Sequence, residues 1–342
     1  MDGRERVKSV KNAIFGGTVT AAVIAGIWLL TSSIRETAAA ILITAVVLFG
    51  AGILIRFLLR GQGRRTQAVA RAGMTVLTIF VFIAVCVYTL APKILFYPNR
   101  DENAERSLAA LDYAEEITFE GKNGTVSGWL LNSAAENAPL ILYFGGNGEC
   151  AAWKLAFMAE SERYAGSFAE YRFAFLDYPS YGKSEGTASE RSFQEHGLDA
   201  YDYFSEERGV SEIYLLGFSI GTGVANYVAS QRDVRGLALF APYANGYDLY
   251  NRQMNIFYGP LRLLVAFRME AEEYAREVRV IPLIYASDTD EIVPYESSKR
   301  LSEAYPNGAE FRTIAGAKHN ESFRPETFLA VREYFSAARE SA

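Results

Sequence analysis

The sequence predicts an α/β domain, with a mostly parallel sheet flanked by helices, preceded by a three-helix transmembrane segment. Long uncharged apolar runs fill the first ninety residues, and short apolar runs alternate with longer amphipathic stretches after them. We therefore divide the chain into a membrane region, residues 1–92, and an α/β domain, residues 93–342. The first region has ten Lys/Arg and three Asp/Glu, whereas the second has 24 and 37. An acidic domain lacks the basic face that nucleic acid requires, so we expect no nucleic-acid partner.

Three apolar runs without a charged residue predict the membrane spans, at residues 13–34, 37–55 and 73–91. A helix needs about 20 such residues to cross the hydrocarbon core, and helix is the spanning structure that satisfies its own backbone. The alternative is a secretory signal followed by buried core helices. A signal has a shorter apolar region, about 7–15 residues, and no clear small-residue cleavage site follows the first run.

The distribution of Lys and Arg predicts the orientation. Four basic residues precede the first run and five lie between the second and third, in the predicted loop 56–72. Arg35, beside Glu36, is the one basic residue between the first two runs. Basic loops stay in the cytoplasm, so we expect a cytoplasmic N-terminus and an α/β domain on the non-cytoplasmic side. The expected location is the plasma membrane, with the lipid bilayer as a partner.

The α/β domain is expected to begin with a hairpin and continue as βαβ units. Residues 115–121 and 125–131 alternate at period two, and the turn signal Lys122-Asn123-Gly124 joins them. Further strands are expected at 139–146, 171–179, 213–218, 236–242, 282–288 and 310–315, and helices near 150–165, 189–208, 220–232, 294–305 and 322–340. Ligands of such sheets bind beyond the carboxyl ends of the strands.

The pattern G-x-S-x-G at residues 217–221 places Ser219 between a predicted strand and a predicted helix. Such a bend exposes the serine hydroxyl at the edge of the sheet, which suits a nucleophile. The alternative is a tight turn without chemistry. A serine needs a base, and His319 follows the last strand, where this chain order puts the base. His196 lies within a predicted helix before the serine strand, and we interpret it as structural.

The acid that orients the histidine is expected between Ser219 and His319, after a strand. We favour Asp290, with Asp288 second and Asp248 a distant third. The oxyanion donors are expected to be the backbone amide of Ile220 and an amide of the glycine-rich loop 145–148.

In that loop Asn147 is the first choice and Gly146 the next, because successive glycines let amides converge. A plain glycine turn is the alternative.

The motifs ILYFGGNGE, FLDYPSYGKSEG, LLGFSIGTGVA, PLIYASDTDEIVP and AGAKHNE occur in the order of a known family. Over about residues 94–340 the chain resembles the α/β-hydrolase superfamily, and within it the membrane-anchored, bud-emergence-related serine hydrolases with one abhydrolase domain. The resemblance implies an α/β-hydrolase fold and esterase or thioesterase activity. It implies Ser219 as the nucleophile, Asp290 as the acid and His319 as the base.

Residues 243–280 are longer than an ordinary crossover needs, so a small cap over Ser219 is one interpretation and a plain crossover helix the other. The expected substrate is a small-molecule ester, thioester or lipid-like compound. Two open alternatives are a peptidase or amidase of the same fold and a non-catalytic scaffold. We expect no cofactor and no metal, because two histidines and two cysteines offer no metal-ligand spacing. Cys86 and Cys150 lie in different regions, so we expect no disulfide.

Overall fold

The computed structural model describes residues 63–135, 138–161 and 170–340, with isolated positions at 45, 49, 50 and 52. The chain divides into two compact units, Met1–Ala91 and Pro92–Ala342. We describe each unit by itself, and the site lies entirely in the second.

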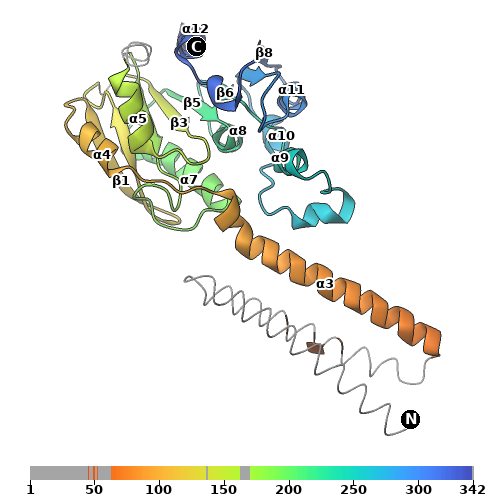
Figure 1. Ribbon diagram of the computed structural model, residues 1–342. Coiled ribbons are helices and arrows are strands. Elements are labelled where there is room, and N and C mark those ends of the chain that lie inside the picture. Colours follow the sequence, from red (N-terminus) through yellow and green to blue (C-terminus); the bar gives the residue numbers. More distant parts are fainter. Residues whose placement is uncertain are drawn as a thin grey trace. The chain divides into compact units, whose positions relative to one another are not determined.

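Helix α3, Arg64–Leu95, contains the predicted span 73–91 (Figure 1). Its window Arg64–Val85 is long and apolar enough to cross a membrane, with a mean hydropathy of 2.1 and none of it buried. The expected loop 56–72 is wrong from residue 64 onward, where the chain is helical. That stretch is rich in Ala and Arg, which favour helix, and holds no proline. The predicted spans 13–34 and 37–55 lie outside the described residues, apart from the isolated positions.

The second unit is built on one eight-stranded sheet, which confirms the predicted α/β class. The strands are β1 (Ala114–Gly121), β2 (Gly124–Leu131), β3 (Leu140–Phe144), β4 (Arg172–Leu176), β5 (Ile213–Phe218), β6 (Gly236–Phe240), β7 (Leu283–Ser287) and β8 (Glu310–Ile314). Their order is β1-β2-β4-β3-β5-β6-β7-β8. The pairs β1–β2 and β2–β4 are antiparallel, and all the others are parallel. Each strand coincides with a predicted one to within a few residues.

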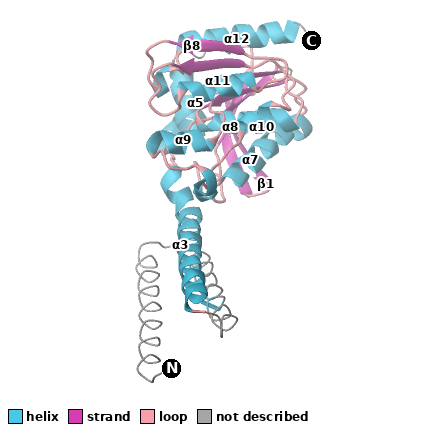
Figure 2. Cartoon of the chain, turned by 90° about the vertical axis from the view of Figure 1, so that its right-hand side faces the viewer, coloured by secondary structure: helices cyan, strands magenta, loops and turns pink. Residues whose placement is uncertain are grey.

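Helices cover both faces of the sheet (Figures 1 and 2). On one face lie α7 (Glu190–Asp202), its π-helical extension η2 (Tyr203–Glu207), α8 (Ile220–Gln231), α10 (Ala271–Ala275) and α11 (Tyr295–Glu303). On the other face lie α4 (Glu102–Ala109), α5 (Ala151–Glu160) and α12 (Pro325–Glu340). Alternation along a strand divides the core: Leu140 and Leu142 of β3 point to the first face, and Ile141 and Tyr143 to the second.

Two parts of this unit differ from a simple alternation of strands and helices. Helix α4 was not predicted; it begins at Asp101, whose carboxylate accepts the Asn103 and Ala104 amides as an N-cap. The segment 243–280 forms two helices, α9 (Gly246–Gln253) and α10, with the 3₁₀ helix η3 (Gly259–Leu264) between them. It is therefore not the single crossover helix that one interpretation expected.

Candidate active site

Ser219 lies at the sharp bend between β5 and α8, with a positive φ of 51°. Positive φ is strained for a residue with a side chain, so the surroundings must hold it. The Ser219 amide donates to the Phe240 carbonyl at 2.9 Å. A Cβ on Gly221 would lie 2.1 Å from the Phe144 carbonyl oxygen, and one on Gly217 would lie 2.9 Å from the Thr222 Cα. Because neither glycine has a Cβ, the backbones of β5, α8 and the end of β3 can approach one another closely at this bend.

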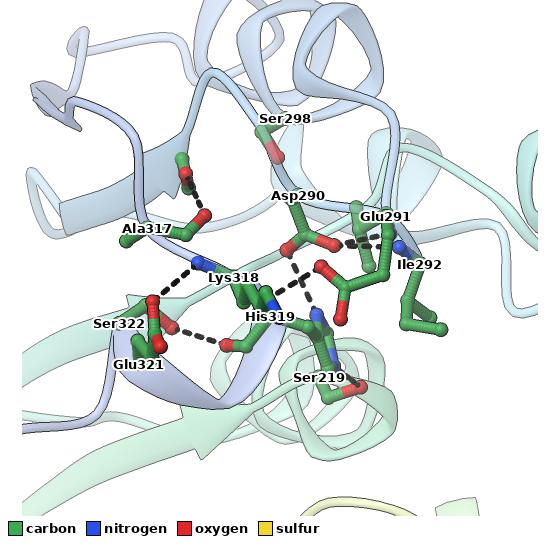
Figure 3. A network of polar contacts seen from close by, with 12 residues as sticks. Ser219, Asp290, Glu291, Ile292, Ser298, Ala317, Lys318, His319, Glu321 and Ser322 are labelled. Atoms are coloured by element: carbon green, nitrogen blue, oxygen red, sulfur yellow. Dashed lines mark hydrogen bonds and ion pairs between the residues drawn. The ribbon is translucent and has the colours of Figure 1, made fainter.

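His319 begins the short helix η4, His319–Glu321, after β8. Its Nε2 lies 2.9 Å from the Ser219 Oγ, and its Nδ1 lies 2.8 Å from the Asp290 Oδ2 (Figure 3). His319 and Asp290 are both buried. His196 lies elsewhere, fully buried in α7 against the Tyr178 ring, and burial lowers its pKa to about 4. It is therefore neutral at neutral pH, as a structural histidine would be.

The structure separates the three candidate acids. Asp290 Oδ1 accepts the amides of Ile292 and Val293, both at 2.8 Å, which leaves Oδ2 for His319 (Figure 3). Asp288 instead accepts the Gly316 amide at 2.8 Å. Asp248 accepts hydrogen bonds from Ser297 and Arg300. Of the three carboxylates, Asp290 is thus the one that the structure brings to the histidine.

Two side chains that sequence reasoning missed fix the position of His319. Glu291 accepts the His319 backbone amide at 3.1 Å, and the Ser322 hydroxyl donates to the His319 carbonyl at 2.9 Å (Figure 3). Hydrogen bonds from its own amide and from the His319 amide lower the pKa of Glu291. The backbone of His319 is therefore held from both sides. No sequence motif distinguishes these residues from ordinary loop residues.

The glycine-rich loop after β3 runs beside the serine. A Cβ on Gly146 would lie 3.7 Å from the Ser219 Cβ. The Gly146 amide, the second choice as an oxyanion donor, already donates to Glu149 Oε2 at 2.9 Å. The Asn147 amide therefore stays the loop's candidate donor, and Ile220, at the first position of α8, stays the other candidate.

A buried ion pair between Lys154 and Glu149 holds this loop, because Glu149 also accepts the Gly146 amide. Lys154 on α5 lies 2.7 Å from Glu149, and both side chains are largely buried. Burial alone would raise the pKa of Glu149, but the Lys154 ammonium and hydrogen bonds from Tyr143 and Gly146 hold that pKa below its usual range. The ammonium also lies 3.8 Å from the centre of the Phe323 ring, a cation–π contact. The pair thus links the loop to residues that follow His319.

The Asn147 side chain ties the same loop to the end of α3. Its amide nitrogen donates to the Leu95 carbonyl at 2.6 Å, and its oxygen accepts the Tyr97 amide at 3.0 Å. The Tyr181 hydroxyl donates to the same oxygen at 2.8 Å. Nearby, Asn99 donates to the Gly148 carbonyl at 3.4 Å. The first residues of the second unit are therefore part of the wall of the site.

Comparison with curated proteins finds relatives of modest identity. The chain is 28% identical over 250 residues to "Uncharacterized protein YfhR" of Salmonella typhi, covering 66% of this chain and 80% of that protein. It is 26% identical over 208 residues to "Lysophosphatidylserine lipase ABHD12" of Danio rerio, covering 56% of this chain and 52% of that protein. No protein-family model matches the chain.

Comparison with solved structures finds the same fold. The Pyrococcus furiosus esterase Pf2001 aligns with a TM-score of 0.53 at 14% identity, over 70% of this chain and 98% of that one. An alpha-beta hydrolase from Vibrio vulnificus aligns with a TM-score of 0.55 at 16% identity, over 70% and 87%. The chain thus has the α/β-hydrolase fold, and its curated relatives include a protein named as a lipase.

Proposed function

We propose that this protein is a membrane-anchored serine hydrolase that cleaves carboxylic esters or thioesters, including lipid or acyl substrates, through an acyl-enzyme. The observation that carries the proposal is the hydrogen-bonded series Ser219–His319–Asp290, with spacings of 2.9 and 2.8 Å. Nucleophile, base and orienting acid need these contacts in this order. The names of the relatives, a lipase and esterases, support ester hydrolysis.

In the acylation step the Ser219 Oγ attacks the substrate carbonyl carbon, and His319 Nε2 takes the hydroxyl proton. The carbonyl π electrons move to the oxygen, which the Ile220 and Asn147 amides stabilise. The bond from carbon to the alcohol or thiol then breaks, and His319 returns the proton to that leaving group. Asp290 stays ionised and stabilises the imidazolium while it exists.

Deacylation repeats the sequence with water. His319 takes a proton from the water as its oxygen attacks the acyl carbon, and then gives that proton to the Ser219 Oγ as the acyl–serine bond breaks. The products are a carboxylic acid and the free serine. Neither step involves a change of oxidation state.

The apolar helix α3 and the apolar segment 243–280 favour a substrate that resides in or at a bilayer. In this proposal α3 anchors the chain, and the hydrolase unit lies on the non-cytoplasmic side of the plasma membrane. In the segment 243–280, residues 243–251 and 264–280 act as a small cap that contacts the acyl chain. A tag at Ala342 that is accessible from the cytoplasm would refute the orientation.

A fluorophosphonate probe tests the chemistry, because it reacts with an activated serine. We expect wild-type protein to be labelled and Ser219→Ala not to be. Serial assays with ester, thioester and peptide substrates then separate an esterase from an amidase. If folded wild-type protein takes no label and has the same activity as Ser219→Ala, the hydrolase proposal fails and the non-catalytic scaffold is the remaining interpretation.

A further inference from the structure

The exposed apolar side chains of the hydrolase unit concentrate in one short segment. Of the twelve large apolar residues that the structure describes as exposed in this unit, five lie within ten residues. These five, together with two exposed arginines, form what we call the 252–263 strip: Arg252, Met254, Ile256, Tyr258, Leu261, Arg262 and Leu263. Single exposed apolar residues are ordinary, whereas a contiguous group of this size marks an interaction surface.

The charge of the strip indicates what covers it. Residues 249–269 contain three arginines and neither Asp nor Glu, in a unit whose acidic residues outnumber its basic ones 37 to 24. The Arg262 guanidinium lies over the Tyr247 ring, 4.6 Å from its centre, and stays exposed. Aromatic and aliphatic side chains interleaved with arginine suit an anionic lipid surface, where the apolar groups enter the acyl boundary and the arginines meet phosphates.

The strip is held by its neighbours rather than loose. The Asn251 side chain accepts the Phe257 amide at 2.8 Å, which closes the turn that presents the apolar groups. Beyond η3 the chain is anchored by Val265, Phe267 and Met269, all buried. The exposed side chains are thus those that the fold leaves outside its own core.

The end of this segment packs beside the point where the chain enters the unit. The Phe267 ring contacts the Phe96 ring edge-on, with centres 5.5 Å apart. Phe96 directly follows α3, whose apolar window ends at Val85. Phe267 follows the strip by four residues, so the strip lies close along the chain to this contact with the residue that follows α3.

We propose that the 252–263 strip docks on an anionic lipid bilayer and so gives the site access to esters that reside in the membrane. The inference rests on the proposed hydrolase function and on anchoring by α3. A second protein is the other class of partner that an apolar surface could meet, and the experiment distinguishes it.

The test uses the full chain in vesicles of phosphatidylcholine with or without phosphatidylglycerol. We compare Leu261→Glu/Leu263→Glu with the matched control Leu329→Glu, which changes an exposed leucine on α12. For a long-chain ester in the anionic vesicles we expect the strip variant to lose about tenfold or more in kcat/KM, because two side chains leave the bilayer. For a short water-soluble ester we expect wild-type activity, and Leu329→Glu should behave as wild type with both.

A spectroscopic arm measures docking without turnover. A bimane label at Leu263→Cys, in a background with Cys86→Ala and Cys150→Ala, should be quenched by brominated lipids, and more strongly in anionic vesicles. A label that brominated lipids do not quench overturns the proposal, and a label that another protein shields from the lipids counts as this result. An equal loss of both ester activities in the strip variant also overturns it. If wild type cleaves neither ester, the hydrolase proposal fails, whereas the quenching result still decides the docking.

Discussion

The buried pair Glu149–Lys154 gives the sharpest test of how the site is supported. Glu149→Gln keeps an oxygen that accepts the Gly146 amide but removes the charge opposite Lys154. Breaking a buried ion pair from one side costs about 3–5 kcal/mol, because the remaining charge is left without its partner. For a unit of this size, 1 kcal/mol shifts the melting temperature by about 2–4 °C. We therefore expect Glu149→Gln to melt roughly 10 °C lower, from the same two magnitudes.

A double-mutant cycle separates the pair from its packing. Lys154→Met fills the space against Phe323 with an apolar chain and removes the second charge. We expect the double variant to be more stable than the sum of the single effects predicts, by about 2 kcal/mol, since neither charge is then buried alone. The assay is thermal unfolding of the full chain in detergent, followed by circular dichroism. Strictly additive losses would refute the reasoning, because they would mean that the two charges do not interact.

The pH dependence follows from the lowered pKa of Glu149. A carboxylate whose pKa is lowered on folding stabilises the protein above its unfolded pKa, about 4.3, and loses that contribution as the pH falls through the folded value. The difference between wild type and Glu149→Gln should therefore be constant from pH 8 to pH 5 and shrink below. A difference that grew on acidification would contradict the assignment.

Three further substitutions test the bend at Ser219, the glycine-rich loop and the buried carboxylate of Asp177, which accepts the Ala151 amide. Gly221→Ala should lower stability by several kcal/mol and abolish turnover, because its Cβ would lie 2.1 Å from the Phe144 carbonyl oxygen. The control Gly73→Ala has nothing within 4 Å of the added Cβ, so it should change neither stability nor turnover in the same melting and ester assays. Asn147→Ala should lower kcat about tenfold with KM nearly unchanged, since it loosens the loop that carries an oxyanion donor; a pure rise in KM would oppose this role. Burial raises the pKa of Asp177 to about 7, so its cost to stability grows as pH rises from about 4 through 7. Asp177→Asn should raise the melting temperature at pH 8 but not at pH 4, and an equal gain at both would exclude titration as the cause.

Local signals were sufficient for the sheet and for two of the candidate catalytic residues. Period-two alternation and continuous apolar runs mark strands β1 to β7, because side-chain burial in a strand depends on its own sequence. The glycines around Ser219 report a steric requirement of one bend, and chain order places His319. Whether the three side chains act as a triad stays a prediction until Ser219 is tested.

Longer-range features could not be predicted. Asp288 and Asp290 are two residues apart in one loop, and they differ in which backbone amides each carboxylate meets after folding. The burial of Lys154 depends on Phe323, which arrives from the far end of the domain. Nothing in a single sequence reports such a contact, since the partners share no periodicity or spacing.

The hydrogen bonds of Asn147 bear on how the chain enters the second unit. A flexible entry would leave the first residues of this unit without contacts to the site. Here the helix runs through Leu95, whose carbonyl accepts a hydrogen bond from Asn147 in the loop beside Ser219, and Phe96 is already buried in the core. The residues that end α3 thus also position a wall of the site. A substitution that removes the contact of Asn147 with Leu95 should therefore disturb the loop beside Ser219, which is the reason for the loss of kcat expected in Asn147→Ala.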